Sequence, residues 1–381
     1  MGNQLALAQF CAAAWRKGAL ALCLALGTLG LGLSAKAQGR KGTIITFDPP
    51  GTGTGAFEGT YPRGITPAGA ITGFYFDENF VDHGFLRAPD GTFTIFDPAG
   101  SFGTAPFSIN PAGAITGFYF DAIGASHGFL RERDGTFTLF DAPGAGTGHF
   151  QGTNPYNINP AGTIAGQYND ASNVFHGFLR TPDGIITTFD APGAGTGAFE
   201  GTFTSGVDGI NPAGAISGGY ADDANVFHGL VRAPDGTFTV FDVPGAGTGS
   251  GQGTFVGGIN PAGVTLGNYI DAGGVNHGFV RAADGTITTF DVVGAGSGSG
   301  QGTLGENINP AGDVTGQYLD ASGVNHGFLR SKHGAITTFD VPGAGTGSSQ
   351  GTIPSSNNPS DAITGLYYDA NNVAHGFLRT R

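Results

Sequence analysis

Apolar and polar residues alternate in short runs along most of the chain, and turn residues separate the runs. Residues 303–340 show the pattern: the runs TLGENIN, DVTGQYLD, VNHGFLR and AITTFD are separated by segments rich in Gly, Pro, Asp and Ser. Alternation with a period of two, in β-branched and aromatic residues, predicts β-strands. The turn residues between them predict hairpins. We therefore predict a four-stranded antiparallel meander with strands of about five or six residues.

The dipeptides His-Gly and Phe-Asp recur along the chain with matching spacings. The histidines of His-Gly are 44, 49, 52, 49, 49 and 49 residues apart, and the Phe-Asp dipeptides are 49, 44, 49, 52, 49 and 49 residues apart, which is the same series shifted by one unit. A fixed period in this range is the sequence signature of a propeller, a solenoid or a repeat array. Seven copies of one unit account for nearly all of the chain after residue 37.

The two ends of the repeat region complement each other. The region begins with an isolated fourth strand, GTIITFD at residues 42–48, and stops after a third strand, HGFLRTR at residues 375–381. If the first strand completes the last unit, a ring closes and the exposed sheet edges are removed. A linear solenoid would gain nothing from this offset and would need polar caps. We therefore predict an all-β fold, a seven-bladed β-propeller of four-stranded antiparallel blades, as one domain over residues 38–381 with repeats of about 49 residues.

The segment DAPGAGTG, at residues 141–148 and again at 190–197, looks like a phosphate-binding loop. A Walker-type loop needs Lys and then Ser or Thr after its last glycine, and a helix must follow. No copy carries that lysine, and a predicted strand follows each one. We therefore interpret the glycine-rich segments as connectors between units, which pass so close to their neighbours that only glycine fits.

The first 37 residues differ from the repeats. Arg16 and Lys17 precede an apolar run at residues 18–35, and Ala35-Lys36-Ala37 matches a small-x-small cleavage site. This order is typical of a secretory signal peptide that is cleaved after Ala37. The alternative is a retained membrane anchor, which the glycines within the run disfavour. We expect a secreted, extracellular or periplasmic protein without membrane insertion after cleavage. Both cysteines lie in this segment, so the exported chain must be stable without disulfides.

Composition and charge narrow the set of partners. Glycine accounts for 72 of 381 residues, against an average of about 7%, which favours short strands and tight turns over helices. The net charge is −13, and it becomes −16 without residues 1–37, because that segment carries three basic residues and no acidic one. This acidity argues against nucleic acids and anionic membranes as partners. It is compatible with cations, neutral polymers or basic proteins.

The repeated HGFLR, together with strands of the pattern I-x-G-x-Y-x-D such as residues 314–320, resembles the HAF repeat of extracellular bacterial proteins. That family is named for a His-Ala-Phe, which stands here as His-Gly-Phe. The resemblance covers essentially all of residues 42–381 and implies export and a repeat architecture. It implies no known activity and assigns no catalytic residues.

One histidine occupies an equivalent place in every unit, whereas a catalytic site needs a single asymmetric constellation. We interpret these histidines as structural residues that satisfy buried polar groups, by analogy with the His-Asp hydrogen bonds of WD-repeat propellers. Histidines spread around a ring do not converge tetrahedrally, so we predict no metal ligand set and no cofactor. The interpretation applies to His83, His127, His176, His228, His277, His326 and His375.

Strand order places the connectors and the Y-x-D turns on one face, which should be acidic and rich in hydroxyl groups. The aspartates there either cap turns or form a shallow binding face for a sugar polymer or a cation such as calcium. The calcium loop D-x-D-x-D-G is absent from the sequence, so calcium stays open only as a ligand of these acidic loops.

A local function is expected where the repeat is broken. The unit after Asp97 lacks the long connector, and its loop brings in an aromatic side chain. Other connectors of the first four units also depart from the serine-rich later copies. Aromatic rings beside carboxylates suit carbohydrate binding, and the alternative is that the rings pack between blades. The candidate ligand-binding residues are Glu58, Phe102, His149, Phe199 and Glu200.

Three classes of function are compatible with this sequence. We predict a secreted, monomeric, non-catalytic binding or scaffold module for a polysaccharide or a cell-envelope protein. One alternative is a propeller enzyme of the lyase or glycosidase type, in which Glu58, Glu200 and His149 would have to meet. The other is a structural surface or matrix protein. The near-identical late repeats favour the binding module and the structural protein over the enzyme.

Overall fold

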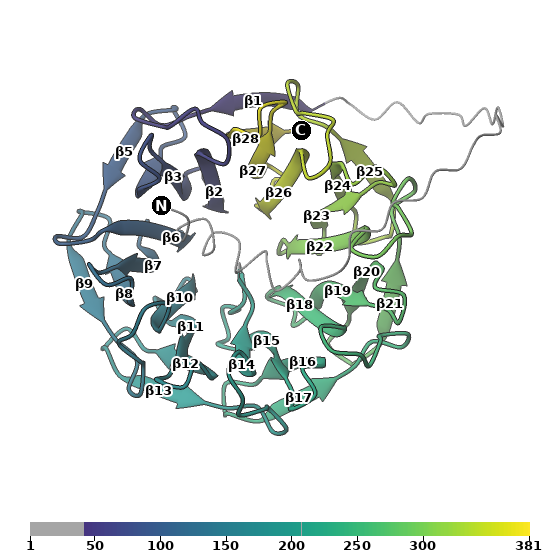
Figure 1. Cartoon of the computed structure of the whole chain (residues 1–381), viewed down its shortest axis with the longest axis horizontal. Helices are drawn as coiled ribbons and strands as arrows, with labels where there is room; N and C mark the ends of the chain where they lie inside the picture. Colours follow the sequence, from purple (N-terminus) through teal and green to yellow (C-terminus); the bar gives the residue numbers. More distant parts are fainter. Residues whose placement is uncertain (1–41, 207) are drawn as a thin grey trace.

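The computed structural model describes residues 42–206 and 208–381, which form 28 strands joined by turns and loops, with no helix. The strands lie around a common centre, and successive parts of the chain follow one another round the ring (Figure 1). The predicted all-β, propeller-like arrangement of repeats is confirmed. The predicted signal peptide lies outside the described residues.

Each repeat contributes strands at four places between the centre of the ring and its rim (Figure 1). The first strands, nearest the centre, are β2 (Gly59–Ile65), β6 (Gly103–Ile109), β10 (Gly152–Ile158), β14 (Gly201–Thr204), β18 (Gly253–Ile259), β22 (Gly302–Ile308) and β26 (Gly351–Asn357). The second strands are β3 (Ile71–Phe76), β7 (Ile115–Phe120), β11 (Ile164–Asn169), β15 (Ile216–Ala221), β19 (Thr265–Ile270), β23 (Val314–Leu319) and β27 (Ile363–Tyr368).

The third and fourth strands follow in the same order. The third strands are β4 (Asp82–Arg87), β8 (Ser126–Arg131), β12 (Phe175–Arg180), β16 (Phe227–Arg232), β20 (Asn276–Arg281), β24 (Asn325–Arg330) and β28 (Ala374–Thr380). The fourth strands, on the rim, are β1 (Thr43–Phe47), β5 (Phe93–Phe96), β9 (Phe137–Phe140), β13 (Ile186–Phe189), β17 (Phe238–Phe241), β21 (Ile287–Phe290) and β25 (Ile336–Phe339).

Antiparallel pairing joins these strands into sheets of four. Strands β2 to β5 pair in sequence order, as do β22 to β25, because short hairpin turns connect them. Strands β26, β27 and β28 pair in the same way. The place beside β28 is taken by β1 from the other end of the sequence, with Phe47 opposite Gly376.

The phenylalanine of each Phe-Asp dipeptide packs between its own sheet and the next one. The Phe47 ring on β1 lies 6.4 Å from the fully buried Phe85 ring on β4, and the Arg87 guanidinium lies 4.9 Å from the Phe47 ring centre. A cation over an aromatic face is attracted by the ring electrons. The other pairs, at 4.7–4.9 Å, are Arg131 with Phe96, Arg180 with Phe140, Arg232 with Phe189, Arg281 with Phe241, Arg330 with Phe290 and Arg379 with Phe339.

The glycine of His-Gly makes room for these interface phenylalanines. A Cβ atom at Gly376 would lie 2.6 Å from the Phe47 ring, which is closer than non-bonded carbon atoms approach. The ring therefore lies directly across the glycine backbone of the neighbouring strand. Phe-Asp, His-Gly and the arginine of HGFLR thus belong to one packing unit, which explains why they recur together.

Asparagine side chains link neighbouring repeats nearer the centre. Asn110 Nδ2 donates to the Asn159 carbonyl oxygen over 3.4 Å, and Asn358 Nδ2 donates to the Thr66 carbonyl oxygen over 3.1 Å. The second bond joins the end of the repeat region to its beginning. These amides are buried, where an unpaired polar group would be costly. Similar bonds run from Asn159 to Asn211, from Asn211 to Asn260 and from Asn309 to Asn358.

We expect Phe47→Ala to lower the free energy of unfolding by about 3–5 kcal/mol, the usual cost of removing a buried phenylalanine. Phe47 holds β1 against the first sheet through Phe85 and Arg87. Chemical denaturation would measure the effect. The control is Ile45→Ala on the same strand, whose side chain is 43% exposed. Equal, small losses for the two variants would contradict this account of the packing.

Candidate ligand-binding pocket

Each repeated histidine lies between two aspartates. His83 Nδ1 lies 2.8 Å from Asp97 Oδ2, and its Nε2 lies 3.7 Å from Asp77 Oδ2. The Tyr75 ring lies against the imidazole, with centroids 5.3 Å apart. Asp77 also accepts hydrogen bonds from the backbone N–H groups of its own turn. The same contacts recur at His127, His176, His228, His277, His326 and His375.

This geometry joins a turn to the rim strand of the same sheet and occurs once per repeat. At His375 the partner is Asp48, and that hydrogen bond is the main cause that raises the pKa of the imidazole. The structural role of these histidines stays a prediction. It is supported by the recurrence of the same contacts, once in each repeat. The asymmetric features of the chain lie elsewhere.

A cavity of ≈230 Å³ lies where the repeat is broken. Strand β6 begins only a few residues after β5 ends at Phe96, whereas a long glycine-rich connector separates β1 from β2. The short connector runs past the cavity, and its Phe102 contributes to the lining. We call this cavity the phenylalanine pocket, because most of its apolar lining is phenylalanine: Phe74, Phe76, Phe80, Phe102, Phe107, Phe118, Phe120 and Phe150.

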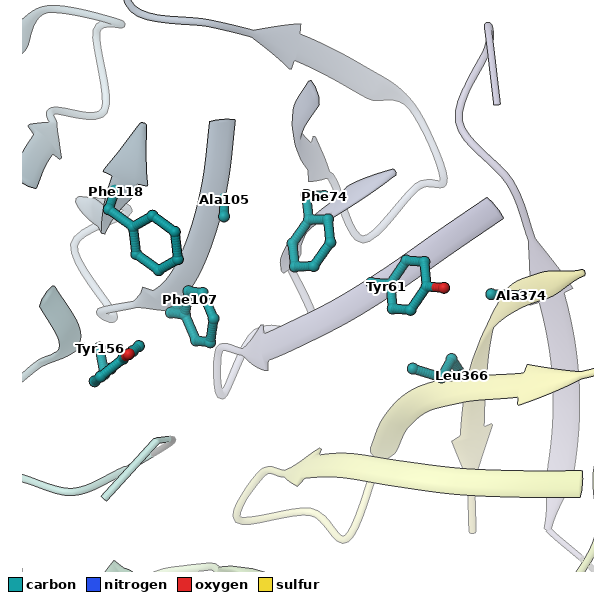
Figure 2. Packing of buried hydrophobic residues seen from close by; sticks show 8 residues of the cluster. All are labelled: Tyr61, Phe74, Ala105, Phe107, Phe118, Tyr156, Leu366 and Ala374. Atoms are coloured by element: carbon teal, nitrogen blue, oxygen red, sulfur yellow. The ribbon is translucent and has the colours of Figure 1, made fainter. Parts of the chain in front are cut away.

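Part of this wall belongs to a buried aromatic cluster. Figure 2 shows Phe74 on β3, Phe107 on β6 and Phe118 on β7, with Tyr61 and Tyr156 to either side. The Phe107 ring centre lies 5.4 Å from that of Phe118 and 5.0 Å from that of Tyr156. The wall is aromatic because the second strands of the first two repeats both read ITGFYF. Later repeats carry Gln167, Gly219, Asn268, Gln317 and Leu366 in place of Phe74 and Phe118.

Two of the lining phenylalanines have strained backbones. Phe80 has φ = 58° and Phe150 has φ = 65°, in the left-handed region that costs an L-residue about 1–2 kcal/mol. A bulky residue is a rare choice there. At the place of Phe80 every other repeat has glycine or asparagine: Gly124, Asn173, Asn225, Gly274, Gly323 and Asn372. Such outliers cluster at functional sites, because strain persists where the side chain is needed.

Asp82 at the start of β4 brings a carboxylate into this apolar wall. Burial raises the pKa of the Asp82 carboxyl from 3.8 to about 7. Within residues 42–206 and 208–381, no other residue donates a hydrogen bond to this carboxylate, and its own backbone N–H is the donor beside it. Other repeats have Ser126, Phe175, Phe227, Asn276, Asn325 or Ala374 at this place.

The short connector explains why this carboxylate faces the cavity. In the third repeat, Gly152 pairs with the backbone of Ser126, so the connector covers the start of the third strand. At the corresponding Gly103, a Cβ atom would collide with Asp82 Oδ1. The Asp82 side chain therefore occupies the space beside Gly103 that the backbone of the third strand occupies in the other repeats.

Arg63 on β2 is the cationic residue of the lining. Its guanidinium lies 5.0 Å from the Phe107 ring centre and 5.4 Å from that of Phe74. Its charge also acts on Glu306 of β22: burial raises the pKa of the Glu306 carboxyl to about 7, and Arg63 opposes this rise. Asp82 lies on β4, two strands away from β2 in the same sheet.

Asp121 and His149 complete the polar part of the lining. Burial favours the neutral form of Asp121, but hydrogen bonds from the backbone N–H groups of Ala125 and Ile123 outweigh it and lower the pKa of this carboxyl. Asp121 is therefore already engaged in its own turn. His149 is exposed, and its ring centre lies 3.7 Å from that of Phe150.

The structure brings two of the five sequence-predicted candidates together. Phe102 and His149 line the same cavity. Glu58 lies in another, polar hollow with Gly51–Gly55, and its Oε2 accepts a hydrogen bond from Gly55 N over 2.6 Å. Glu200 Oε2 accepts a similar bond from Gly197 N over 2.7 Å. Phe199, with half of its side-chain surface exposed, lies next to Glu200 on that connector.

Sequence reasoning missed Asp82, Phe80, Arg63 and the paired phenylalanines of β3 and β7. A signal for them was present, because each stands where other repeats carry a different residue type. The candidates predicted from the sequence all lie on the connectors. The pocket draws on strands and on the turn before β4 as well.

No family model and no curated protein sequence matches the chain. Among solved structures, virginiamycin B lyase from Staphylococcus aureus is similar, with a TM-score of 0.57 and 12% identity over 90% of this chain and 100% of that one. A streptogramin B lyase gives 0.54 and 14% over 89% and 98%. A lectin from Burkholderia pseudomallei gives 0.51 and 11% over 90% and 99%. These likenesses establish an all-β, propeller-like fold.

Membrane-spanning helices and clusters of metal-binding side chains are both absent from the described residues. In the part of the chain that the structure describes, no helix is long and apolar enough to cross a membrane. Across residues 42–206 and 208–381, no three histidine, cysteine or acidic side chains are placed to hold a metal ion together.

We expect Asp82→Asn to stabilise the protein more at pH 8 than at pH 5. The folded protein holds the Asp82 proton up to about pH 7, while the unfolded chain releases it near pH 3.8, so Asp82 costs stability as the pH rises between these values. The gain should be on the order of 2 kcal/mol larger at pH 8 than at pH 5. Urea denaturation at the two pH values measures it.

Asp90→Asn is the matched control for this prediction. It makes the same change of charge at an exposed turn, where bonds from Thr92 lower the pKa of the carboxyl. It should therefore give no gain at pH 8. If Asp82→Asn and Asp90→Asn show the same pH profile, Asp82 is not a buried, unpaired carboxylate.

Proposed function

We propose that this protein is an exported, non-catalytic binding module, and that the phenylalanine pocket is its binding site for a small ligand with apolar groups. One observation carries the proposal: the break in the repeat, the cavity and Phe80, a phenylalanine with a left-handed backbone where every other repeat has glycine or asparagine, coincide. Pockets for small molecules are typically apolar with a few polar groups that fix orientation. Asp82, Arg63, Asp121 and His149 are the polar groups here.

The proposal also includes the number of blades and the closure of the ring. The scaffold is a seven-bladed propeller in which β1 supplies the rim strand of the last blade and closes the ring. The pairing of β1 with β28 supports this, as do the Asn358–Thr66 hydrogen bond and the contact of Phe47 with the first sheet. Closure would give the site a rigid frame without disulfides.

The resemblance to HAF-repeat proteins and the sequence of residues 1–37 support export. Cleavage after Ala37 would leave a chain that begins at Gln38. We expect N-terminal sequencing of the protein recovered from the periplasm or the medium of a bacterial host to read from Gln38. A chain retained in the membrane fraction with residues 1–37 intact would contradict this prediction.

A polysaccharide or a cell-envelope protein is the wider partner class that the acidic face would suit, and calcium would be a ligand of its loops. The enzyme alternative needs Glu58 or Glu200 to meet His149. Glu58 and His149 line different hollows, and the carboxylates of Glu58 and Glu200 are bonded within their own connectors. This placement supports the binding module over the enzyme.

We expect small neutral molecules with an apolar ring to bind in the pocket. The probes are benzyl alcohol and a panel of phenyl glycosides, detected by saturation-transfer NMR on residues 38–381. The variant Phe80→Asn should weaken binding about tenfold, or 1.4 kcal/mol, because a wall of the pocket is lost. It should keep or raise the stability of the protein, because asparagine tolerates the left-handed backbone at this place.

Phe199→Ala is the matched control, since Phe199 lies on another connector with φ = 69°. If the probes still bind to Phe80→Asn and no longer bind to Phe199→Ala, the binding site lies on the connector loops and not in the pocket. No saturable binding of any probe to the parent protein would overturn the pocket as a ligand site and leave the structural role.

A further inference from the structure

We propose that the ligand of the phenylalanine pocket is a small organic cation, an amine or quaternary ammonium group carrying alkyl or aryl substituents, held by Asp82 and the surrounding rings. This inference rests on the proposed binding function and adds the chemical class of the ligand. It follows from the side chains that meet in the cavity.

The first step is the unpaired carboxylate. A charge beside apolar rings is normally paired or hydrogen-bonded, because desolvation is costly, and the Asp82 side chain is half-buried among such rings. Asp82 has its own backbone N–H and no other donor among the described residues. A cationic group in the cavity would supply the missing partner. A neutral ligand would leave the carboxylate either unpaired or protonated.

The second step is the nature of the walls. The faces of phenylalanine rings attract cations, and aromatic cages are a recurrent way to bind quaternary ammonium groups. Two rings of this wall already receive a cation in this way, because Arg63 lies 5.0 Å from the centre of Phe107 and 5.4 Å from that of Phe74. Phe80, Phe102 and Phe150 are further rings of the lining, and the Phe102 ring is exposed.

The third step concerns the other charged groups around Asp82. His83 on the same strand and Asp97 after β5 act on it with opposite signs. Asp121 is engaged by its own turn, and His149 lies on the connector before β10. Arg63 is the one guanidinium of the lining, and its charge is opposed by Glu306. Of the two carboxylates of the lining, Asp82 is therefore the one that its own turn does not engage.

The charge of the whole protein acts in the same direction. The net charge is −13, and aspartates follow every Y-x-D strand on the face where the turn before β4 lies. Such a surface concentrates cations near the pocket and repels anions. A cavity of ≈230 Å³ fits a compact ammonium with a short substituent and excludes a long polymer.

The test compares choline with 3,3-dimethyl-1-butanol, which has the same shape and no charge. Both are titrated calorimetrically into residues 38–381 at pH 8. We expect choline to bind at least about tenfold more tightly, since a charge-assisted contact is worth about 1.5–3 kcal/mol. Affinity for choline should fall about tenfold from pH 8 to pH 6, in proportion to the ionised fraction of a carboxyl with pKa about 7.

Two variants make the test specific to Asp82. Asp82→Asn, which installs the residue found at Asn276 and Asn325, should abolish the preference for choline over the neutral alcohol and the pH dependence of choline binding. Asp90→Asn on a distant turn should leave both affinities unchanged. It controls for the net charge of the protein.

The outcomes separate this inference from the function on which it rests. Equal binding of the two isosteres, or a preference that persists in Asp82→Asn, overturns the cationic ligand and leaves a pocket for neutral molecules. Failure of choline to bind while benzyl alcohol or a phenyl glycoside binds has the same meaning. Failure of every probe overturns both proposals.

Discussion

The packing of one phenylalanine between each sheet and the next is the interaction on which the rest of the structure depends. A single structural repeat cannot bury its hydrophobic face alone and depends on its neighbours to cover it. Phe47 joins the last sheet to the first through Phe85 and Arg87, in the same way that Phe96 joins the first sheet to the second through Phe129 and Arg131. Because each sheet is held on both sides by the same contact, the repeats keep a common orientation around the centre, and residues at equivalent places meet equivalent surroundings.

Because equivalent places have equivalent surroundings, a residue that differs from its counterparts in the other repeats indicates a local difference in structure. Where the connector is long, its glycine-rich loop covers the start of the third strand, as Gly152 does at Ser126. Between β5 and β6 the connector is short. The interface phenylalanine Phe96 still joins the two sheets there, but side chains take the space that a connector loop covers in the other repeats. The cavity is therefore a local consequence of one missing loop within an otherwise unchanged frame. The packing between the sheets fixes the strands and turns that carry Asp82 and the rings of the pocket, so these side chains need not contact one another to keep their positions.

The repeat allowed much of the fold to be predicted from the sequence. The runs VNHGFLR and AITTFD contain β24 and β25, and the isolated GTIITFD contains β1 beside β28. Phe102 and His149 were found because they break the pattern of the connectors. Asp82 breaks the pattern equally, but its importance depends on burial and on the uncovered space beside Gly103, which only the folded chain defines. Glu58 and Glu200 also break the pattern, but their carboxylates accept the same backbone bonds as the glutamines of other connectors.

The pocket combines two features that a stable repeat would avoid. Phe80 occupies a left-handed backbone position that glycine or asparagine fills elsewhere, and Asp82 places a carboxylate where its pKa rises to about 7. Either change toward the residues of the other repeats would relieve strain or desolvation without altering the packing between sheets. Local rules that are broken together at one place, while neighbouring copies obey them, are typical of a functional site. The sum of these costs therefore points to a ligand, and a positive charge on that ligand would offset the larger of the two.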